Sequence, residues 1–232
     1  MAGISRDGPE HTSSEHFWER HYRRQEKHGS IEPNPILAEV VRPLTPGTAL
    51  DLGCGQGSDA IWLALNGWRV TAVDVSVFAL DLAAERAAAA DVANRIDWQR
   101  HELAHTFPVG SFDLVSAQYL QSPVEFSRDR VLQAAARTVA PGGLLLIVDH
   151  GAVRAPWAWK LDPETHIPTP EEILAALDLT PRHWRTEVIA SPERQAAGPN
   201  GQFATVTDNV VAIRRLPQRS GDRALEAGLR SG

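Results

Sequence analysis

Residues 48–74 read TALDLGCGQGSDAIWLALNGWRVTAVD. The segment begins with an apolar run that ends at Leu52, and three glycines follow within the next five residues. A mostly apolar stretch then leads to a second strand-like run that ends at Asp74. This order of strand, glycine turn, helix and strand is typical of a βαβ unit, which holds a nucleotide-type ligand at its turn.

The spacing of the glycines indicates which ligand the turn suits. It is Gly53-x-Gly55-x-Gly57, whereas a dinucleotide fingerprint is Gly-x-Gly-x-x-Gly, and Ser58 stands in the last of those places. That last glycine brings helix and strand close together beside a pyrophosphate. S-adenosylmethionine (SAM) has no pyrophosphate, and its cationic amine suits an acid at Asp51. The spacing therefore favours SAM over a nicotinamide cofactor.

A second acid supports a nucleotide-type ligand. Asp74 ends the second strand, seventeen residues after Gly57, and an acid there can accept hydrogen bonds from both ribose hydroxyls. NAD sites share this acid, so it discriminates little between the two ligands. The helix that starts at Ser58 would direct free N–H groups toward the bound molecule.

Composition excludes several other classes of function. The chain has 232 residues, 43% of them hydrophobic and 22% charged, which fits one globular domain. Its net charge is −6 and its basic residues are scattered, so nucleic acid is disfavoured as a partner. We find no apolar run long enough for a membrane span and no secretory signal in residues 1–15. Because Cys54 is the only cysteine, no internal disulfide can form, and a cytoplasmic location is expected.

Helical and strand patterns alternate along the chain. After residue 30, helices are expected over 36–44, 58–68, 76–90, 128–139 and 170–177, with a turn at 141–143. Strands are expected over 48–52, 69–74, 95–99, 112–117, 144–148, 184–189 and 203–214. The alternation predicts an α/β fold with a Rossmann-like, doubly wound sheet. We divide the chain into a disordered start with a cap helix (1–29), the main domain (30–215) and a loose tail (216–232).

An N-terminal helix is expected over about residues 13–29. It places Phe17, Trp18, His21 and Tyr22 close together on one side. Two interpretations stay open, because these aromatic residues could pack on the edge of the domain or cap a cofactor cleft. The four histidines of the region are mostly five residues apart, which rotates each away from the last, so no metal site is expected there: His11, His16, His21 and His28.

Six segments carry a resemblance to a known family: 17–22, 34–35, 50–57, 72–76, 112–115 and 140–143. Together they resemble the class I SAM-dependent methyltransferases, nearest the small stand-alone enzymes of the tellurite-resistance and thiopurine-methyltransferase group. The resemblance runs from about Trp18 to Arg215. It implies a sheet of seven strands in the order 3-2-1-4-5-7-6, with the last strand antiparallel and helices on both faces.

The resemblance also implies a set of cofactor contacts. The glycine loop would line the methionine and the ribose, and Asp74 would hold the ribose hydroxyls. Glu102 and Leu103 follow the third strand, where the family usually has Asp and an apolar residue that hold the adenine amine. Gln118 ends the fourth strand, where the chain passes the transferred methyl group. The expected cofactor-binding residues are Trp18, Tyr22, Asp51, Gly53, Gly55, Gly57, Asp74, Val75, Glu102, Leu103 and Gln118.

The acceptor side of the site is less defined by the sequence. Metal-dependent catechol-type enzymes have an acid where this chain has Gln118, which argues against Mg²⁺, although Asp149 follows the fifth strand. His150 is a candidate general base, with a strand-capping role as the alternative. Trp157 and Trp159 could wall an aromatic acceptor or fill a groove at the edge of the domain.

We therefore predict a metal-independent, SAM-dependent methyltransferase that moves a methyl group to an O, N or S atom of a small molecule and releases S-adenosylhomocysteine. One alternative is a non-catalytic SAM-binding sensor or partner protein. A nicotinamide-dependent oxidoreductase is the other. The acceptor, the use of a base, and the choice between monomer and homodimer stay open.

Overall fold

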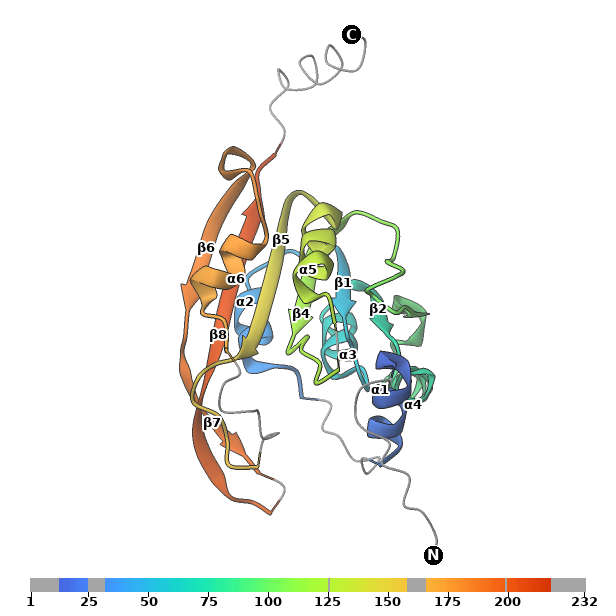
Figure 1. The fold of residues 1–232 in the computed structure, drawn as a ribbon. Coiled ribbons are helices and arrows are strands. Elements are labelled where there is room, and N and C mark those ends of the chain that lie inside the picture. Colours follow the sequence, from blue (N-terminus) through green and yellow to red (C-terminus); the bar gives the residue numbers. More distant parts are fainter. Residues whose placement is uncertain (1–12, 25–31, 125, 158–165, 199, 218–232) are drawn as a thin grey trace, which may run out of the picture.

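The computed structural model describes residues 13–24, 32–124, 126–157, 166–198 and 200–217. Within these ranges the chain forms an eight-stranded sheet with helices on both faces (Figure 1). The strands are β1 (Thr48–Leu52), β2 (Arg69–Asp74), β3 (Ile96–Arg100), β4 (Phe112–Gln118), β5 (Val139–His150), β6 (Trp184–Ala190), β7 (Glu193–Ala197) and β8 (Phe203–Arg215). The helices are α1 (Ser14–Arg24), α2 (Pro35–Val41), α3 (Ser58–Leu65), α4 (Val77–Ala89), α5 (Arg128–Thr138) and α6 (Pro170–Ala176), with short 3-10 helices at Ala93–Arg95 and Pro181–His183.

The strand order is β3-β2-β1-β4-β5-β8-β6, with β7 paired to β8 beside this path. Strands β1 to β5 run parallel, and β8 runs antiparallel to β5 and β6. The predicted order is confirmed, with β8 as the antiparallel last strand. Since β1 lies between β2 and β4, the order reverses there, and the carboxyl ends of the strands leave a crevice at that point.

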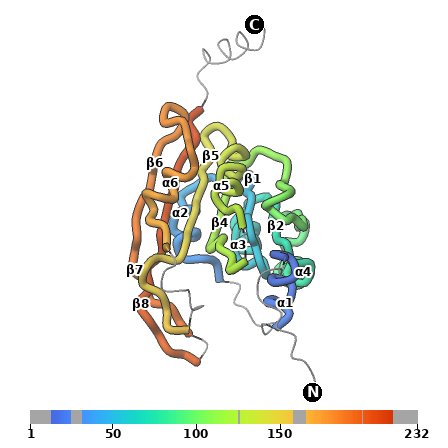
Figure 2. The backbone as a smooth tube through the Cα atoms, viewed as in Figure 1, coloured from blue at the N-terminus to red at the C-terminus, as the bar shows by residue number. Residues whose placement is uncertain are grey.

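The prediction of seven strands missed β7. This strand pairs antiparallel with the start of β8, from Glu193 opposite Thr207 to Ala197 opposite Phe203. Its sequence, ERQAA, contains no β-branched or aromatic residue, so it carries no strand signal of its own, and pairing with the long β8 overrides that propensity. The hairpin reaches past the carboxyl ends of the parallel strands, on the side of the sheet away from α1 (Figure 2).

The predicted turn at residues 141–143 is wrong, because these residues belong to β5. The pairing with β4 steps from Val139 opposite Phe112 to Leu144 opposite Leu114, so the extra residues of β5 form a bulge. Gly142 takes a φ of +86° in this irregular stretch. The strand expected over 144–148 begins five residues earlier, as β5. The other elements expected between residues 32 and 217 each have a counterpart, with ends moved by up to three residues.

Each face of the sheet has its own hydrophobic core. On one face, Ile61 of α3 and Leu146 of β5 belong to one buried cluster. On the other face, Leu132 of α5 and Ile173 of α6 share a second cluster with Leu145. Adjacent residues of β5 thus face opposite cores, as expected for a central strand covered on both sides. The two layers of helices hold the carboxyl ends of the strands in fixed positions.

Helix α1 lies outside both cores, and none of its residues is fully buried. It packs on α4 at the carboxyl end of the sheet (Figure 1). The ring of Trp18 lies 5.3 Å from that of Phe17 and 5.9 Å from that of Tyr22, so the aromatic residues gather on one side as predicted. None of the described helices is long and apolar enough to cross a bilayer.

Several predictions fall on residues outside the described ranges. These are the disordered start over residues 1–11, the helix end at Gly29 and Trp159. Of the predicted tail 216–232, only residues 216 and 217 are described, and the backbone N–H of Leu216 donates to the carbonyl of His183 at 2.8 Å.

Candidate functional site

Three glycines with left-handed backbone form the turn from β1 to α3. Their φ angles are +68° at Gly53, +52° at Gly55 and +80° at Gly57, a region that residues with a side chain rarely adopt. A Cβ at Gly55 would lie 2.8 Å from the hydroxyl oxygen of Tyr22, and one at Gly57 would lie 2.7 Å from the ring of Trp98. Gly57 therefore allows close packing on β3, whereas Gly55 lies under a side chain of α1.

Asp74 holds this loop from the end of β2. Its Oδ2 accepts a hydrogen bond from the backbone N–H of Gly55, and its Oδ1 accepts one from Ser76, both at 2.9 Å. The Ser76 hydroxyl donates to Glu19 of α1 at 2.6 Å. The backbone N–H of Val75 also bonds the Asp74 carboxylate, which leaves it one lone pair with which to accept a ligand hydroxyl. One buried acid thus links β2, the glycine loop and the start of α4.

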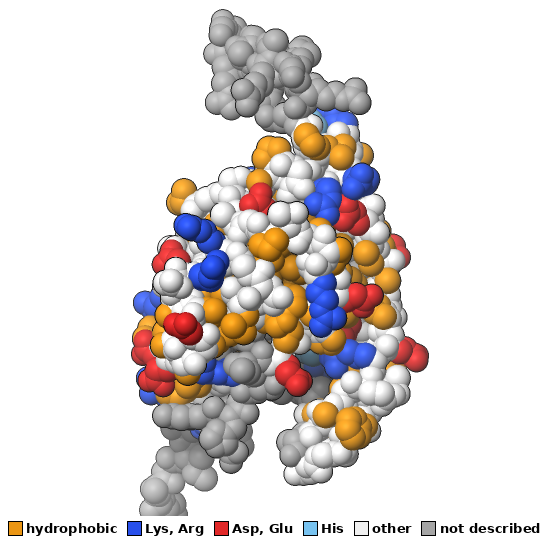
Figure 3. All heavy atoms as spheres, turned by 180° about the vertical axis from the view of Figure 1, so that it is seen from behind, with side chains coloured by type: hydrophobic (Ala, Val, Ile, Leu, Met, Phe, Trp, Pro, Cys, Tyr) orange, Lys and Arg blue, Asp and Glu red, His pale blue; other side chains and the backbone are white. Residues whose placement is uncertain are grey.

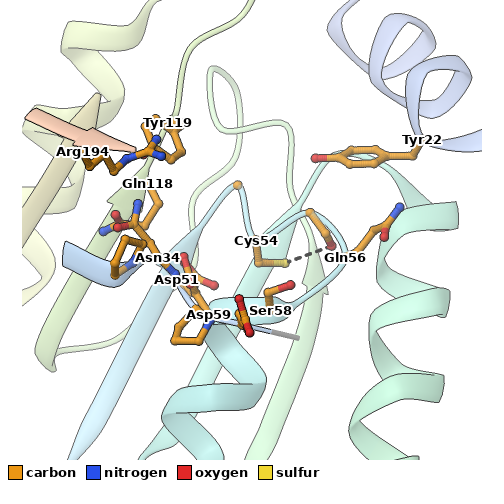
Figure 4. Close-up of a pocket in the computed structure, with 15 residues that line it drawn as sticks. Tyr22, Asn34, Asp51, Cys54, Gln56, Ser58, Asp59, Gln118, Tyr119 and Arg194 are labelled. Atoms are coloured by element: carbon orange, nitrogen blue, oxygen red, sulfur yellow. Dashed lines mark hydrogen bonds between the residues drawn. The ribbon is translucent and has the colours of Figure 1, made fainter. Parts of the chain in front are cut away.

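A pocket of about 430 Å³ opens beside the loop, within the usual size range for small-molecule sites (Figure 4). Tyr22 lies on one side of it, and Tyr119 and Arg194 lie on the other. The floor between them is formed by the glycine loop, the start of α3 and the segment before α2. The lining residues are Tyr22, Glu32, Pro33, Asn34, Pro35, Asp51, Gly53, Cys54, Gly55, Gln56, Ser58, Asp59, Gln118, Tyr119 and Arg194.

Three buried polar atoms, each on a residue that lines this pocket, have no hydrogen-bond partner in the described structure. They are Nδ2 of Asn34, Oδ2 of Asp51 and Oε1 of Gln118. A buried polar atom without a partner carries a free-energy cost, so such atoms are normally satisfied by a ligand or water. One donor and two acceptors suit a zwitterionic amino acid group, with the donor on its carboxylate and the acceptors on its ammonium.

The buried acids Asp51 and Asp59, below the loop, are suited to bind a cationic group. Burial, and then the nearby carboxylates of Asp59 and Asp74, raises the pKa of Asp51 well above its usual value. Burial raises the pKa of Asp59 to about 6. A bound ammonium would favour the ionised form of both acids. Burial also raises the pKa of the Cys54 thiol, so that cysteine is not an activated nucleophile.

The opposite wall of the pocket is built from β4, β7 and β8. Arg194 of β7 donates to the hydroxyl of Tyr119 at 2.9 Å and forms an ion pair with the buried Asp208 of β8. The ring of Tyr119 stacks on that of His150, with centroids 4.2 Å apart. Burial, and then the charge of Arg154, lowers the pKa of His150 to about 4, so its imidazole is neutral at neutral pH.

Asp149, at the end of β5, is paired with an arginine of α5. Its carboxylate forms an ion pair with Arg128, whose Nε also donates to the carbonyl of Leu120 at 2.9 Å. Burial raises the pKa of Asp149 to about 6. In the part of the chain that the structure describes, no three His, Cys, Asp or Glu side chains are grouped as a metal site would require.

The structure brings together five of the predicted site residues. Tyr22, Asp51, Gly53, Gly55 and Gln118 all line the pocket. Asp74 lies directly behind Gly55, and His150 lies behind Tyr119. The other predicted residues lie outside the lining: Trp18, Gly57, Val75, Glu102 and Leu103. Of the two loop tryptophans, Trp157 is half-buried.

Sequence reasoning missed several residues of the pocket, and four of them make contacts that shape the site. Asn34 was noted only within the resemblance segment 34–35, and in the structure it caps α2 by accepting from the N–H of Ile36. Asp59 accepts the N–H of Asn34 at 2.7 Å, a contact across 25 residues that no local pattern indicates. Tyr119 directly follows the predicted Gln118, and that position was a usable signal. Arg194 lies in β7, which the sequence did not predict.

Comparison with known proteins agrees with this geometry. Residues 49–143 match the family model of a methyltransferase domain. A stretch of 127 residues is 36% identical to 27-O-demethylrifamycin SV methyltransferase of Amycolatopsis mediterranei (strain S699), covering 53% of this chain and 46% of that protein. Residues 49–143 thus belong to a methyltransferase domain. The glycine loop, Asp51 and Asp74 all lie within the matched residues of this methyltransferase domain.

The fold of the methyltransferase domain is shared with solved structures. One, described under the conversion of a disulfide bond into a thioacetal group during echinomycin biosynthesis, matches with a TM-score of 0.69 at 22% identity, over 93% of this chain and 97% of that one. TehB from Haemophilus influenzae matches with a TM-score of 0.61 at 16% identity, over 85% of this chain and 67% of that one. At these identities the likeness is one of fold.

The chain spans less than half the length of the curated relatives that it matches. Some of these relatives are named as methyltransferases of ribosomal RNA or of ribosomal protein L11. The domain is therefore common to enzymes with different acceptors.

We expect Glu19→Ala to release α1 from the rest of the protein. Glu19 accepts hydrogen bonds from the Ser76 hydroxyl and from the backbone N–H of Phe78, and losing a charged partner costs about 1.5–3 kcal/mol. Hydrogen exchange of the α1 amides should accelerate while the cores stay protected. Glu15→Ala is the control, because its half-exposed pair with Arg100 contributes little. Unchanged exchange of α1 in the first variant would contradict this role.

Proposed function

We propose that the protein transfers the methyl group of SAM to a small-molecule acceptor in this pocket. The observation that carries the proposal is the set of unpartnered buried atoms of Asn34, Asp51 and Gln118 beside the glycine loop. These atoms match the two charged groups at the methionine end of SAM. Asp51 and Gln118 lie within the matched methyltransferase domain, which supports that assignment.

In this proposal three side chains and two glycines hold the methionine end of SAM. Asp51 and Gln118 accept from the ammonium of the methionine, and Asn34 donates to its carboxylate. Gly53 and Gly55 let the cofactor approach the backbone without a Cβ in the way.

The rest of the cofactor is assigned by the resemblance to the family. Asp74 meets the ribose, Val75 is a further cofactor contact, and Glu102 and Leu103 meet the adenine. Trp18 and Tyr22 cover the cofactor from α1, which Glu19 holds on the start of α4.

The chain's contribution to the chemistry is mainly alignment and exclusion of water. Bound SAM supplies a methyl group on a sulfonium; as the acceptor atom bonds to that carbon, the C–S bond breaks and its electron pair stays on sulfur. Holding two reactants in line lowers the barrier by several kcal/mol without a catalytic side chain. His150 is the candidate general base, but it lies behind the ring of Tyr119 and outside the pocket lining. With a pKa of about 4 it can serve only an acceptor that reaches past Tyr119 and gives up a proton readily.

Three observations support a small-molecule acceptor. The pocket has a volume of about 430 Å³ and is bounded by side chains on both sides. The rifamycin relative is named for a small-molecule acceptor. Acidic and basic side chains are interspersed on the face shown in Figure 3, which differs from the basic track that nucleic acid requires.

Calorimetric titration with SAM, S-adenosylhomocysteine and NAD tests the cofactor. We expect SAM and S-adenosylhomocysteine to bind and NAD not to bind, and binding of NAD alone would refute the proposal in favour of an oxidoreductase. Transfer of a tritiated methyl group should then be screened over thiols, phenols, amines, carboxylic acids and ribosomal RNA. Transfer to RNA alone would refute the small-molecule acceptor. SAM binding without transfer to any acceptor would favour a SAM sensor instead.

A further inference from the structure

Tyr119 holds a backbone conformation that its residue type rarely adopts. Its φ is +51°, and for a bulky residue this left-handed region persists only where the surroundings impose it. Three contacts do so here: its N–H donates to the carbonyl of Val148, its ring stacks on His150, and its hydroxyl accepts from Arg194. The strained residue lies in the lining of the pocket, directly after Gln118.

Arg194, on the same wall, has N–H groups that make no hydrogen bond within the described residues. Its Nε and Nη2 donate to the two carboxylate oxygens of Asp208, and Nη2 also donates to the hydroxyl of Tyr119. In the described structure the two N–H groups of Nη1 make no hydrogen bond, and the residue lines the pocket. A guanidinium with two free N–H groups in a fixed plane is well suited to bind an oxyanion.

The charges around His150 favour an anion at this wall. Among the described residues, the charges that act on it are those of Arg154, Arg194 and Asp208. The Nε of Arg154 is buried and has no partner in the described residues. Tyr119 is neutral, because burial and then the charge of Asp208 raise its pKa to about 12. Among the described groups that act on His150, two guanidinium groups against one carboxylate leave one positive charge in excess at this wall.

We propose that the methyl acceptor carries a carboxylate or phosphate group, which binds Arg194 beside the ring of Tyr119. The proposal rests on the proposed function, since it names the acceptor class for the same pocket. The β7–β8 hairpin then forms the acceptor-selecting wall, and Tyr119 is a positioning residue that Arg194 and His150 keep in place. Basic and uncharged acceptors are disfavoured.

Binding of small probes tests this without knowledge of the natural acceptor. Benzoate, phenyl phosphate, benzamide and benzylamine would be titrated by ligand-observed NMR, with and without saturating S-adenosylhomocysteine. We expect at least one of the two anions to bind about tenfold tighter than benzamide, the difference typical of a charged hydrogen bond. The tighter of the two anions identifies the group that the acceptor carries. Benzylamine should bind more weakly than either.

Arg194→Met should remove this preference for anions. Because that variant leaves the buried Asp208 without its cationic partner, the double variant Arg194→Met/Asp208→Asn is made as well, to keep the network neutral. Arg185→Met is the matched control, since Arg185 is an exposed arginine of β6 that lies outside the pocket. The control should keep the preference of the wild type.

Three outcomes would overturn the proposal: no anion binds up to its solubility limit, benzamide or benzylamine binds as tightly as the anions, or the preference survives in a folded double variant. These outcomes are distinct from failure of the proposed function. A protein that binds neither SAM nor S-adenosylhomocysteine refutes the proposed function, whereas one that binds the cofactor without preferring anions refutes only the acceptor class.

Discussion

Gly55→Val should abolish measurable SAM binding while the protein stays folded. Gly55 has a φ of +52°, where a β-branched residue is strongly disfavoured. Its new Cβ would lie 2.8 Å from the hydroxyl oxygen of Tyr22, which would have to leave its place above the loop. The displaced loop would also disturb the bond from Gly55 N–H to Asp74. Both changes should lower the affinity for SAM, which calorimetry would measure.

Gly142→Val is the matched control for this variant. Gly142 also has a positive φ, +86°, but a Cβ there meets nothing within 4 Å, and the residue lies in the β5 bulge. Both variants should lose about 1–2 kcal/mol of folding stability, because a residue with a side chain is disfavoured in a left-handed backbone conformation. Only Gly55→Val should lose SAM. If both variants bind SAM as the wild type does, or both lose it equally, the pocket is not the cofactor site.

The central part of the fold could be predicted because its signals are local. The apolar runs 48–52 and 69–74 and the glycines between them indicate β1, α3 and β2 without reference to the rest of the chain. The strand order came from the resemblance to the family rather than from any pattern in the residues. It agrees with the structure from β3 to β6, with β8 in the last antiparallel position.

The acceptor wall could not be predicted because its causes are distant in the sequence. β7 exists because β8 continues far enough to pair with it, and no strand propensity marks its residues. Arg194 reaches Tyr119 across 75 residues, and Asp59 reaches Asn34 across 25. The positive φ of Tyr119 likewise depends on contacts with β5 and β7, so no local sequence pattern predicts it. Sequence reasoning thus described the donor side of the pocket far better than the acceptor side.

The glycine loop has two roles that the sequence did not separate. Gly55 lies against Tyr22 in the pocket, whereas a Cβ at Gly57 would meet Trp98 and Ala83 of the core. The third glycine is therefore required by the packing of α3 on β3 and α4 even without a ligand. Loss of SAM binding in a Gly57 variant would consequently say less about the cofactor than the same loss at Gly55.

Asp51→Asn should weaken SAM binding and at the same time stabilise the protein without cofactor. Asp51 is almost fully buried, its Oδ2 has no partner, and it lies beside Asp59 and Asp74. Losing the charge should raise the Kd for SAM between about tenfold and a hundredfold, the range for a hydrogen bond to a charged group. Stability should rise because a buried acid among like charges disfavours the folded state at neutral pH.

The effect on stability has a defined pH dependence. Burial, followed by repulsion from Asp59 and Asp74, raises the pKa of Asp51 in the folded protein, so the folded state holds a proton that the unfolded state releases above about pH 3.9. The stability that this group contributes is therefore present at low pH and is lost as the pH rises. Asp51→Asn and the wild type should have similar Tm values near pH 4. Toward neutral pH the variant should melt higher, by about 2–4 °C for each kcal/mol recovered.

Asp113→Asn is the matched control, because it makes the same change of net charge at an exposed acid near the start of β4 that lies outside the pocket. It should leave the SAM affinity unchanged and should not reproduce the rise in Tm, since Asp113 accepts bonds from the backbone N–H and the hydroxyl of Thr48. An Asp51→Asn variant that binds SAM as tightly as the wild type would remove Asp51 from the cofactor site. One that melts lower at neutral pH would mean that the ionised carboxylate stabilises the fold. A gain in stability with a loss of affinity is expected only if Asp51 is kept charged and buried for its ligand.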